Sequence, residues 1–281
     1  MTRRLLGTLS ATLTATVLVG APPAASAATT TTFAGTVALS NCSGSVVKLA
    51  GAALTDRALV LSNGHCLEEG FPKAGEVIID KPSRRTFSLL SPDGKSTVGT
   101  LRATKIVYAT MTDTDTSLYQ LSTSYAQIKQ RYGIAALELS PAHPAAGRHI
   151  DVVSGYWKQI YSCSLDGFVH ELHEADWVWK DSIRYRPECT TIGGTSGSPI
   201  VETSTGKVIG INNTGNRSGQ RCTLNNPCEV AADGTVTVRQ GINYGEQTYL
   251  FYGCLKAGSE IDLTKPGCAL PKPAAVAVLA A

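Results

Sequence analysis

Short runs of β-branched and apolar residues recur along most of the chain, separated by glycine, proline, asparagine and aspartate. Several runs alternate between apolar and polar residues, which is the period of a strand with one buried face. Many short strands with frequent turn signals predict an all-β protein, built as a sandwich or a barrel. We expect strands at 35–39, 46–49, 58–62, 76–79, 97–108, 149–154, 177–185, 207–212 and 235–240. One helix is expected at 124–131, capped by Ser124 and ended by Gly133.

The first residues have the pattern of a secretory signal peptide. Two arginines at 3–4 precede an apolar stretch at 5–21, and small residues at 25–27 match a cleavage site. The stretch is too short and too weakly apolar to favour a membrane anchor. We therefore expect residues 1–27 to be removed, with a mature chain that begins near Ala28 and is exported to the extracellular space.

Charge gives no sign of a nucleic-acid or membrane partner. The full chain has 25 Lys and Arg against 22 Asp and Glu, and the leader takes two arginines with it, which leaves 23 against 22 and a formal charge of +1. Binding to nucleic acid or to an anionic membrane would require a basic patch. The residues 271–281 at the other end are expected to form a flexible tail.

An even number of cysteines in an exported chain indicates disulfides. Pairing of neighbours in sequence is expected for Cys222–Cys228 and for Cys254–Cys268. A zinc site is the alternative, but no two cysteines have the CxxC spacing that such sites favour. All eight candidates follow the leader: Cys42, Cys66, Cys163, Cys189, Cys222, Cys228, Cys254 and Cys268.

Three segments carry residue types that could act together in catalysis. His65 follows the apolar run 58–61 and stands next to a cysteine, and Asp115 begins an alternating strand, with Asp113 as its nearest competitor. Ser196 lies in the Gly-Gly-Thr-Ser-Gly-Ser-Pro segment 193–199. Glycines there allow the backbone to approach a bound carbonyl group, and neighbouring N–H groups could form an oxyanion hole.

The order of these residues separates the known serine-hydrolase designs. An α/β-hydrolase needs its histidine after the serine, but the last histidine of the chain is His173. The subtilisin order needs an aspartate before the histidine, and only Asp56 precedes His65. The order His, Asp, Ser fits only the chymotrypsin scheme.

With these motifs the chain resembles the chymotrypsin/trypsin superfamily of serine proteases, and within it the bacterial glutamyl-endopeptidase-like branch. The resemblance implies an all-β fold of two packed six-stranded antiparallel β-barrels, with the active site in the cleft between them. The protease domain would cover 28–270, with a first barrel at about 33–135 and a second at about 148–255. It also implies a Cys42–Cys66 disulfide that holds the histidine loop. The segments that carry the resemblance are Gly64-His65-Cys66, Asp115-Thr116-Ser117-Leu118, Gly194-Thr195-Ser196-Gly197-Ser198-Pro199 and Val208-Ile209-Gly210-Ile211-Asn212.

The same resemblance implies a secreted serine endopeptidase that hydrolyses polypeptides through an acyl-enzyme. Ser196 would be the nucleophile, His65 the general base and acid, and Asp115 the residue that orients the imidazole. The backbone N–H groups of Gly194 and Ser196 would bind the oxyanion. No metal or cofactor is needed, and the enzyme is expected to act as a monomer.

The sequence departs from trypsin at the residue before the serine. Trypsin has an aspartate there, which pairs with a new N-terminus of Ile-Val-Gly-Gly type, whereas this chain has Thr195 and no such N-terminus. A neutral hydroxyl group cannot replace an ion pair. We therefore expect local hydrogen bonds and disulfides to hold the serine loop, without trypsin-like activation.

The specificity pocket is expected at 190–192, 212–215 and 241–243. Trypsin has an acid where this chain has Thr190, so cleavage after Lys or Arg is disfavoured. Glutamyl endopeptidases have Thr or Ser at the position of Thr191, which fits, but a histidine at the position of Asn212, which does not. A polar or small residue before the scissile bond is therefore predicted. The substrate-binding candidates are Thr190, Thr191, Asn212, Asn213, Gly215 and Gly241.

Three other interpretations compete with an active serine protease. A catalytically inactive homologue could serve as a secreted binding protein, because fold does not fix function. A metalloprotease is suggested by His170 and His173, although they are three residues apart and the helical zinc motif needs four. Ser45 and Lys48 have the SxxK spacing of penicillin-recognising enzymes, but the companion motifs are absent.

Overall fold

A computed structural model describes residues 30–274 as an all-β protein with one α-helix and two short 3-10 helices. The predicted signal peptide, Ala28 and the end of the predicted tail at 275–281 lie outside the described residues. No helix among the described residues is long and apolar enough to cross a membrane.

Six strands of the first half close into an antiparallel barrel, in the order β1, β5, β6, β7, β3, β2 and back to β1. Two further strands extend this sheet, since β4 pairs with β6 and β8 runs parallel to β2. The strands are β1 (Thr36–Ala38), β2 (Ser43–Lys48), β3 (Arg57–Ser62), β4 (Val77–Pro82), β5 (Thr86–Leu90), β6 (Thr97–Thr110), β7 (Thr116–Ser124) and β8 (Leu137–Glu138).

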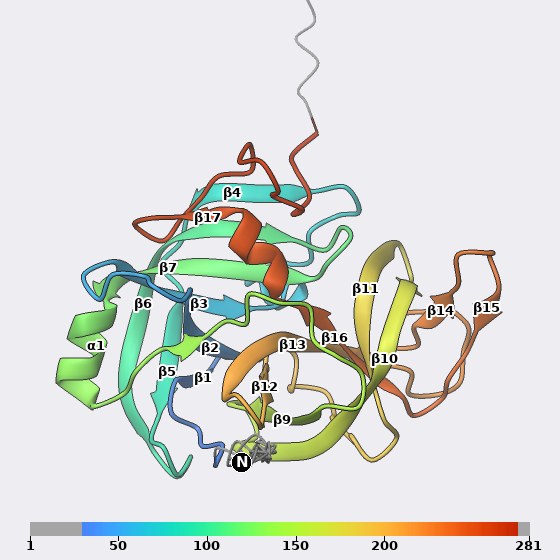
Figure 1. The fold of residues 1–281 in the computed structure, drawn as a ribbon, viewed down its shortest axis with the longest axis horizontal. Coiled ribbons are helices and arrows are strands. Elements are labelled where there is room, and N and C mark those ends of the chain that lie inside the picture. The colour runs from blue at the N-terminus through green and yellow to red at the C-terminus, as the bar shows by residue number, and fades with distance from the viewer. Residues whose placement is uncertain (1–29, 275–281) are drawn as a thin grey trace, which may run out of the picture.

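The second half closes in the same way, in the order β11, β16, β13, β12, β9, β10 and back to β11, and it lies beside the first barrel (Figure 1). The strands β14 and β15 extend it beyond β10. The predicted fold of two six-stranded antiparallel barrels is therefore confirmed. The strands are β9 (His149–Ser154), β10 (Gln159–Glu174), β11 (Trp177–Tyr185), β12 (Pro199–Glu202), β13 (Lys207–Gly215), β14 (Cys228–Val230), β15 (Val236–Thr237) and β16 (Asn243–Gln247).

Strand β3 shows how the two barrels are joined. Its Ala58 and Val60 point into the core of the first barrel, whereas Leu59 and Leu61 belong to a second cluster. That cluster also contains Val153 from β9 and residues of the C-terminal segment, so it is the core between the barrels. The C-terminal segment carries η2 (Tyr249–Gly253) and the hairpin of β17 (Leu255–Lys256) and β18 (Glu260–Ile261). Because both faces of β3 are buried, its sequence is a continuous apolar run.

The helix α1 (Tyr125–Tyr132) forms where it was predicted. Ser124 accepts a hydrogen bond from the backbone N–H of Gln127, whose side chain in turn accepts one from the N–H of Ser124, which makes a capping box. Gly133 ends the helix with φ +70°, a left-handed conformation that glycine adopts without strain.

All eight cysteines are paired, in Cys42–Cys66, Cys163–Cys189, Cys222–Cys228 and Cys254–Cys268. The structure thus contains the pair that the family resemblance implied and both pairs expected from proximity in sequence. Such a framework is typical of proteins of oxidising compartments.

Some predicted strands were wrong or incomplete. The run 235–240 forms only the two residues of β15, because its partner β14 offers just two paired positions at the edge of the sheet. None of the expected ranges covers β5, β8, β10, β12, β14, β16, β17 or β18. Strand β10 is the longest in the described part of the chain and is rich in charged and aromatic residues, so no clean alternation indicated it.

Candidate active site

The histidine loop is built around the carboxylate of Asp115. The 3-10 helix η1 (Gly64–Cys66) follows β3, and the Cys42–Cys66 disulfide ties it to the first barrel. Gly64 packs so tightly that a Cβ atom there would lie 2.2 Å from the carbonyl oxygen of Thr110. Only glycine fits, which brings the backbone of η1 against the side chain of Asp115.

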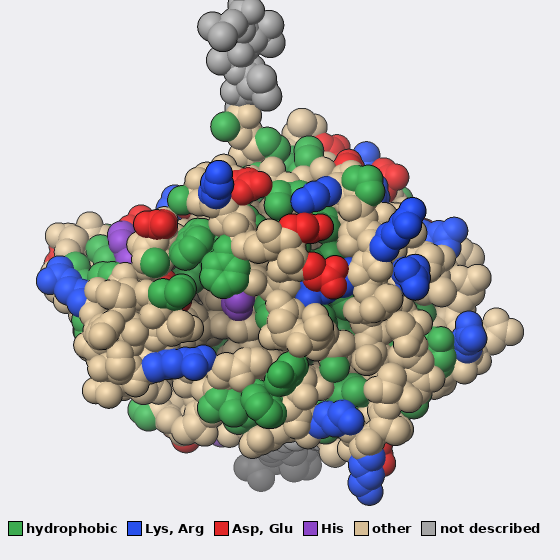
Figure 2. Space-filling model, turned by 180° about the vertical axis from the view of Figure 1, so that it is seen from behind, with side chains coloured by type: hydrophobic (Ala, Val, Ile, Leu, Met, Phe, Trp, Pro, Cys, Tyr) green, Lys and Arg blue, Asp and Glu red, His purple; other side chains and the backbone are tan. Residues whose placement is uncertain are grey.

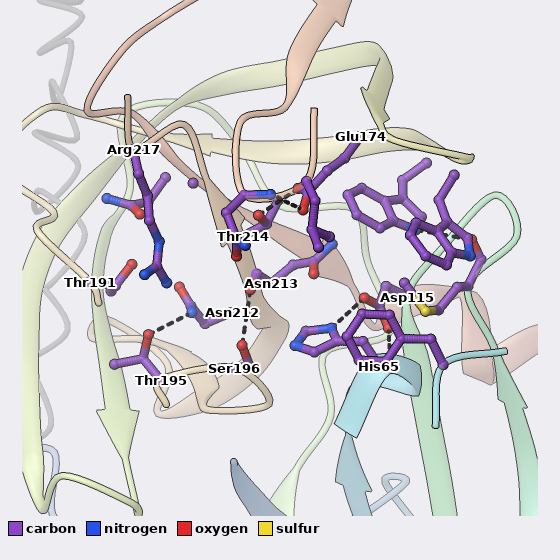
Figure 3. A pocket seen from close by; sticks show the side chains of 18 of the residues that line it. His65, Asp115, Glu174, Thr191, Thr195, Ser196, Asn212, Asn213, Thr214 and Arg217 are labelled. Atoms are coloured by element: carbon purple, nitrogen blue, oxygen red, sulfur yellow. Dashed lines mark hydrogen bonds and ion pairs between the residues drawn. The ribbon is translucent and has the colours of Figure 1, made fainter. Parts of the chain in front are cut away.

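Asp115 is fully buried and holds His65 from two sides. Its Oδ1 accepts hydrogen bonds from the backbone N–H groups of Gly64 and His65, at 2.6 and 3.1 Å. Its Oδ2 lies 2.6 Å from Nδ1 of the His65 imidazole. This contact orients the ring, leaving Nε2 on the side of the cavity as Figure 3 shows.

Two features of the surroundings of His65 change its pKa in opposite directions. Burial lowers the pKa of His65, but the charge of Asp115 and the hydrogen bond that its carboxylate accepts from the imidazole outweigh burial, with a smaller contribution from Glu174. The net result is a pKa above the ordinary value of 6.5. A stronger base is better suited to take a proton from a hydroxyl group.

Ser196 lies across the same cavity, on the second barrel. The imidazole of His65 faces its hydroxyl group in Figure 3. No hydrogen bond joins the two among the described residues; the hydroxyl of Ser196 instead donates to the backbone oxygen of Asn213, at 3.3 Å. A change of the Ser196 rotamer is therefore needed before its proton can pass to His65.

Two backbone donors beside the serine are unused. Within residues 30–274, neither the N–H of Gly194 nor that of Ser196 donates to a protein acceptor. Gly194 has φ +90° and Gly197 has φ +78°, conformations that glycine adopts without strain. At Gly197 a Cβ atom would also lie 2.2 Å from the backbone oxygen of Ser43. The glycines of this segment thus set the path of the loop that carries both donors.

Thr195 replaces the missing ion pair of trypsin with local hydrogen bonds. It is 1% exposed, donates its hydroxyl proton to the backbone oxygen of Ile192 and accepts a hydrogen bond from Nδ2 of Asn212 at 3.0 Å. Asn212, a predicted substrate-binding residue, therefore uses its amide donor inside the protein. Its Oδ1 is buried without a partner among the described residues.

The cavity between the barrels contains most of the predicted site residues. His65 and Asp115 line it from the first barrel, and the second barrel contributes Ser196 with the predicted specificity residues Thr191, Asn212, Asn213 and Gly215. Thr190 and Gly241 are exposed and do not line it. Asn243 occupies the space above Gly215, where a Cβ would meet its Oδ1 at 2.0 Å.

Two cavity residues were not predicted as site residues. Arg217 reaches from the end of β13 towards Thr191 and Asn212 (Figure 3), and its guanidinium group makes no ion pair or hydrogen bond with another described residue. Glu174 ends β10, accepts hydrogen bonds from the Thr214 hydroxyl and the Asn225 N–H, and is buried, which raises its pKa. Glu174 follows His173, in the segment where the sequence suggested a metal motif but no role for Glu174 itself.

Another acid lies deeper behind the site. Glu246 is 1% exposed and accepts hydrogen bonds from the Ser182 hydroxyl and from Nδ2 of Asn213. Burial raises the pKa of Glu246 well above its usual range, and the charge of nearby Asp115 adds to the effect. Asn213 thus connects Glu246 to the hydroxyl of Ser196, and nothing in the sequence pattern signalled this link.

The competing motifs are placed differently. His170 and His173 lie on strand β10 rather than on a helix, and His173 pairs with Glu171 at 2.8 Å. Ser45 is fully buried in β2, and Lys48 forms an ion pair with Glu138. Cys42 and Cys66 lie near His65, but their sulfurs are joined in a disulfide, so neither is available as a thiolate ligand.

The surface of this region is mostly polar with an apolar border. In the space-filling view of the face opposite to Figure 1, hydrophobic side chains gather around a histidine near the middle of the molecule (Figure 2). The exposed large hydrophobic residues include Phe71, Ile192 and Leu224, which line the cavity, and Tyr156 and Trp157 beside it.

Comparisons with known proteins agree with this architecture. A family profile described as a trypsin-like peptidase domain matches residues 42–211. A comparison with curated proteins found no match.

Solved structures resemble the chain at low sequence identity. The apo MamO protease domain from Magnetospirillum magneticum is 11% identical with a TM-score of 0.48, over 79% of this chain and 96% of that one. The active form of the Rv3671c protease from M. tuberculosis is 13% identical with a TM-score of 0.49, over 86% and 84%. The protease Anisep from Arthrobacter nicotinovorans is 16% identical with a TM-score of 0.45, over 80% and 95%.

Proposed function

Because the chain belongs to the family of trypsin-like peptidase domains, we propose that it is a secreted serine endopeptidase whose triad is His65, Asp115 and Ser196. The observation that carries the proposal is the shared cavity in which the imidazole, fixed by a buried carboxylate, faces the serine hydroxyl beside two unused backbone donors. The three residues come from both barrels, so only the folded chain brings them together.

Catalysis would begin when a peptide carbonyl carbon enters between His65 and Ser196. The Ser196 hydroxyl turns from the Asn213 oxygen towards His65, gives its proton to Nε2, and its oxygen forms a bond to the carbonyl carbon. The N–H groups of Gly194 and Ser196 stabilise the resulting oxyanion, where loss of one donor costs about 3 kcal/mol in a comparable enzyme. His65 then protonates the leaving amine as the C–N bond breaks.

Water completes the cycle. It attacks the acyl-enzyme while giving a proton to His65, and the proton returns to the Ser196 oxygen as the acid product leaves. Asp115 stabilises the imidazolium in both halves of the reaction. The raised pKa of His65 fits this role, because the same group must accept and release a proton in each turnover.

The residue before the scissile bond is proposed to be acidic. The sequence pointed to a polar pocket without a cation, but Arg217 places an unpaired guanidinium group beside Thr191 and Asn212 in the cavity, among the described residues. A guanidinium group binds a carboxylate through charge-assisted hydrogen bonds. The proposal thereby keeps the resemblance to the glutamyl-endopeptidase-like branch, with Arg217 as the cation in place of a histidine at the position of Asn212.

The test is hydrolysis of peptide libraries by the exported full chain, together with labelling by a fluorophosphonate. We expect turnover and labelling by the natural chain and neither by Ser196→Ala. The matched control is Ser198→Ala, because the Ser198 hydroxyl is buried, makes no hydrogen bond among the described residues, and lies two positions away. A correctly folded natural chain that neither labels nor cleaves would favour the inactive binding protein instead.

A further inference from the structure

The peptide bond between Gly193 and Gly194 is the least constrained part of the proposed oxyanion hole. Neither residue has a Cβ, so the peptide unit can rotate about its flanking bonds with little steric cost. Rotation by half a turn would exchange the direction of the Gly193 carbonyl with that of the Gly194 N–H, because the two point in opposite directions across a trans peptide. The site would then lose a donor and gain an acceptor.

We propose that Trp157 is a positioning residue that prevents this rotation by donating its indole N–H to the carbonyl oxygen of Gly193. Its Nε1 lies 2.7 Å from that oxygen. With the carbonyl held on the tryptophan side, the N–H of Gly194 must point away from it, and no protein acceptor in residues 30–274 takes this N–H. The inference rests on the proposed function, since it assigns a role within the same site.

Trp157 is itself held by contacts that reach back to the first barrel. Its backbone N–H donates to the hydroxyl of Ser154, at 3.3 Å, and the Ser154 hydroxyl lies 3.2 Å from that of Ser43. The Ser43 hydroxyl accepts a hydrogen bond from the N–H of Tyr156, and the rings of Tyr156 and Trp157 form a T-shaped pair with centroids 4.9 Å apart. Although 48% exposed, Trp157 thus sits on a turn that two buried serines hold in place.

Ser43 also holds the next carbonyl groups of the serine loop. The Ser43 hydroxyl donates to the Gly194 oxygen at 3.2 Å, and the Ser43 N–H donates to the Ser196 oxygen at 2.8 Å. The carbonyl groups of Gly193, Gly194 and Ser196 are therefore all bound from outside the cavity, which leaves the N–H groups of Gly194 and Ser196 without competitors.

This arrangement explains how the chain can do without the ion pair of trypsin. Thr195 holds its own segment through Ile192 and Asn212, but those bonds do not touch the Gly193 carbonyl. Of the described contacts, only the indole of Trp157 reaches it. A hole assembled in this way needs no newly cut N-terminus.

The test compares Trp157→Phe with the natural chain. Phenylalanine keeps an aromatic ring but has no N–H, so a fraction of the protein should adopt the rotated peptide. We expect kcat/KM to fall about three- to tenfold, the range that one hydrogen bond to a neutral carbonyl can shift an equilibrium. The affinity of a peptide aldehyde, which forms an oxyanion on the serine, should fall by the same factor.

Three readouts separate positioning from a general structural role. The KM for substrate, the affinity of the cleaved product and the melting temperature should change little, because none depends strongly on the oxyanion donors. The matched control is Tyr156→Phe, which alters the neighbouring aromatic residue by removing a hydroxyl that makes no hydrogen bond among the described residues. It should behave like the natural chain in every readout.

The outcomes separate the two proposals. If the natural chain is inactive and unlabelled, the proposed function itself fails. If the natural chain is active and Trp157→Phe retains its kcat/KM and aldehyde affinity within about twofold, which is less than one such hydrogen bond is worth, the role of Trp157 is overturned. A loss that appears only in KM, or that parallels an equal loss in Tyr156→Phe, would also overturn it.

Discussion

The two sides of the cavity are organised by different means. On the first barrel, a buried carboxylate makes three contacts with the histidine loop, and a disulfide closes that loop. On the second barrel, the Ser196 hydroxyl is not bound to His65, and the loop depends on neutral hydrogen bonds from Ser43, Trp157 and Asn212. The acid–base side is thus fixed before substrate arrives, whereas the nucleophile side still has a rotamer to change.

This difference predicts that damage to the first side costs most. Asp115→Asn removes the charge that stabilises the imidazolium. An asparagine amide also presents an N–H donor to Nδ1 of His65 where the carboxylate was an acceptor, which favours the wrong tautomer of the imidazole. We expect kcat to fall about 10⁴-fold, the scale seen when the triad aspartate of trypsin is replaced by asparagine. Steady-state hydrolysis of one peptide substrate would measure it.

The control for that variant is Asp113→Asn. Asp113 is two residues earlier and forms a surface ion pair with Lys180 at 2.9 Å. This role differs from the one assigned to Asp115, which holds the imidazole of His65. Activity should stay within about twofold, because surface ion pairs contribute little. A large loss in Asp113→Asn with little in Asp115→Asn would show that the wrong acid has been assigned.

Specificity should be the next largest effect. Arg217→Gln removes the guanidinium charge but keeps a long polar side chain. We expect the preference for Glu over Gln before the scissile bond to fall about 10- to 100-fold, the scale of one or two charge-assisted hydrogen bonds. This preference is measured as the ratio of kcat/KM for two peptides that differ only at this residue. An unchanged ratio would show that Arg217 does not bind the carboxylate of the substrate.

Loss of the neutral hydrogen bonds that hold the serine loop on the second barrel should have a smaller effect, which is measured as stability. Thr195→Val keeps the shape of the side chain but leaves the buried Asn212 amide without its acceptor, whereas the Ile192 oxygen loses one of two donors and keeps the backbone N–H of residue 195. Buried groups left unsatisfied cost about 1–3 kcal/mol each, so the melting temperature should fall. Thr195→Ser, which retains the hydroxyl, should lose less; equal losses would mean that the methyl group rather than the hydroxyl matters.

The smallest expected change is a shift along the pH axis. His65 must be neutral to act as a base, and Asp115 holds its pKa above 6.5, so kcat/KM should fall as pH drops through that raised value. In Asp115→Asn the cause that raises the pKa is gone, and the acidic limb should move to lower pH. The pH profiles of the two proteins measure this; a limb that stays in place would argue that another group sets it.

The same pKa has a consequence for stability. A folded-state pKa raised above the unfolded value stabilises the fold most below the unfolded pKa, and this contribution is lost as pH rises through the folded pKa. The ion pair of His65 with Asp115 therefore favours the folded state at pH values below the raised pKa of His65, where the imidazole is charged and, in the proposed mechanism, cannot act as a base.

The sequence predicted the fold and the main residues of the cavity better than the contacts around them. The histidine, aspartate and serine segments, in their fixed order, carry the resemblance to chymotrypsin-like proteases, and that resemblance implied the two-barrel fold. Trp157 and Ser43 gave no such signal, because each reaches the site from a distant segment with no local motif, and Arg217 lies two residues beyond the predicted pocket segment 212–215. The role of Trp157 depends on where one turn places an indole, and only the packed barrels determine that.

The most direct test of Ser196 as the nucleophile is to mix the natural chain with a slow ester substrate, quench the reaction rapidly and identify the acylated peptide by mass spectrometry. We expect the acyl group on the peptide that contains Ser196, and we expect an acyl-enzyme already formed to persist longer after a drop in pH that protonates His65. Acylation at another residue, or turnover with no acyl-enzyme under conditions where it should persist, would contradict a serine nucleophile activated by His65.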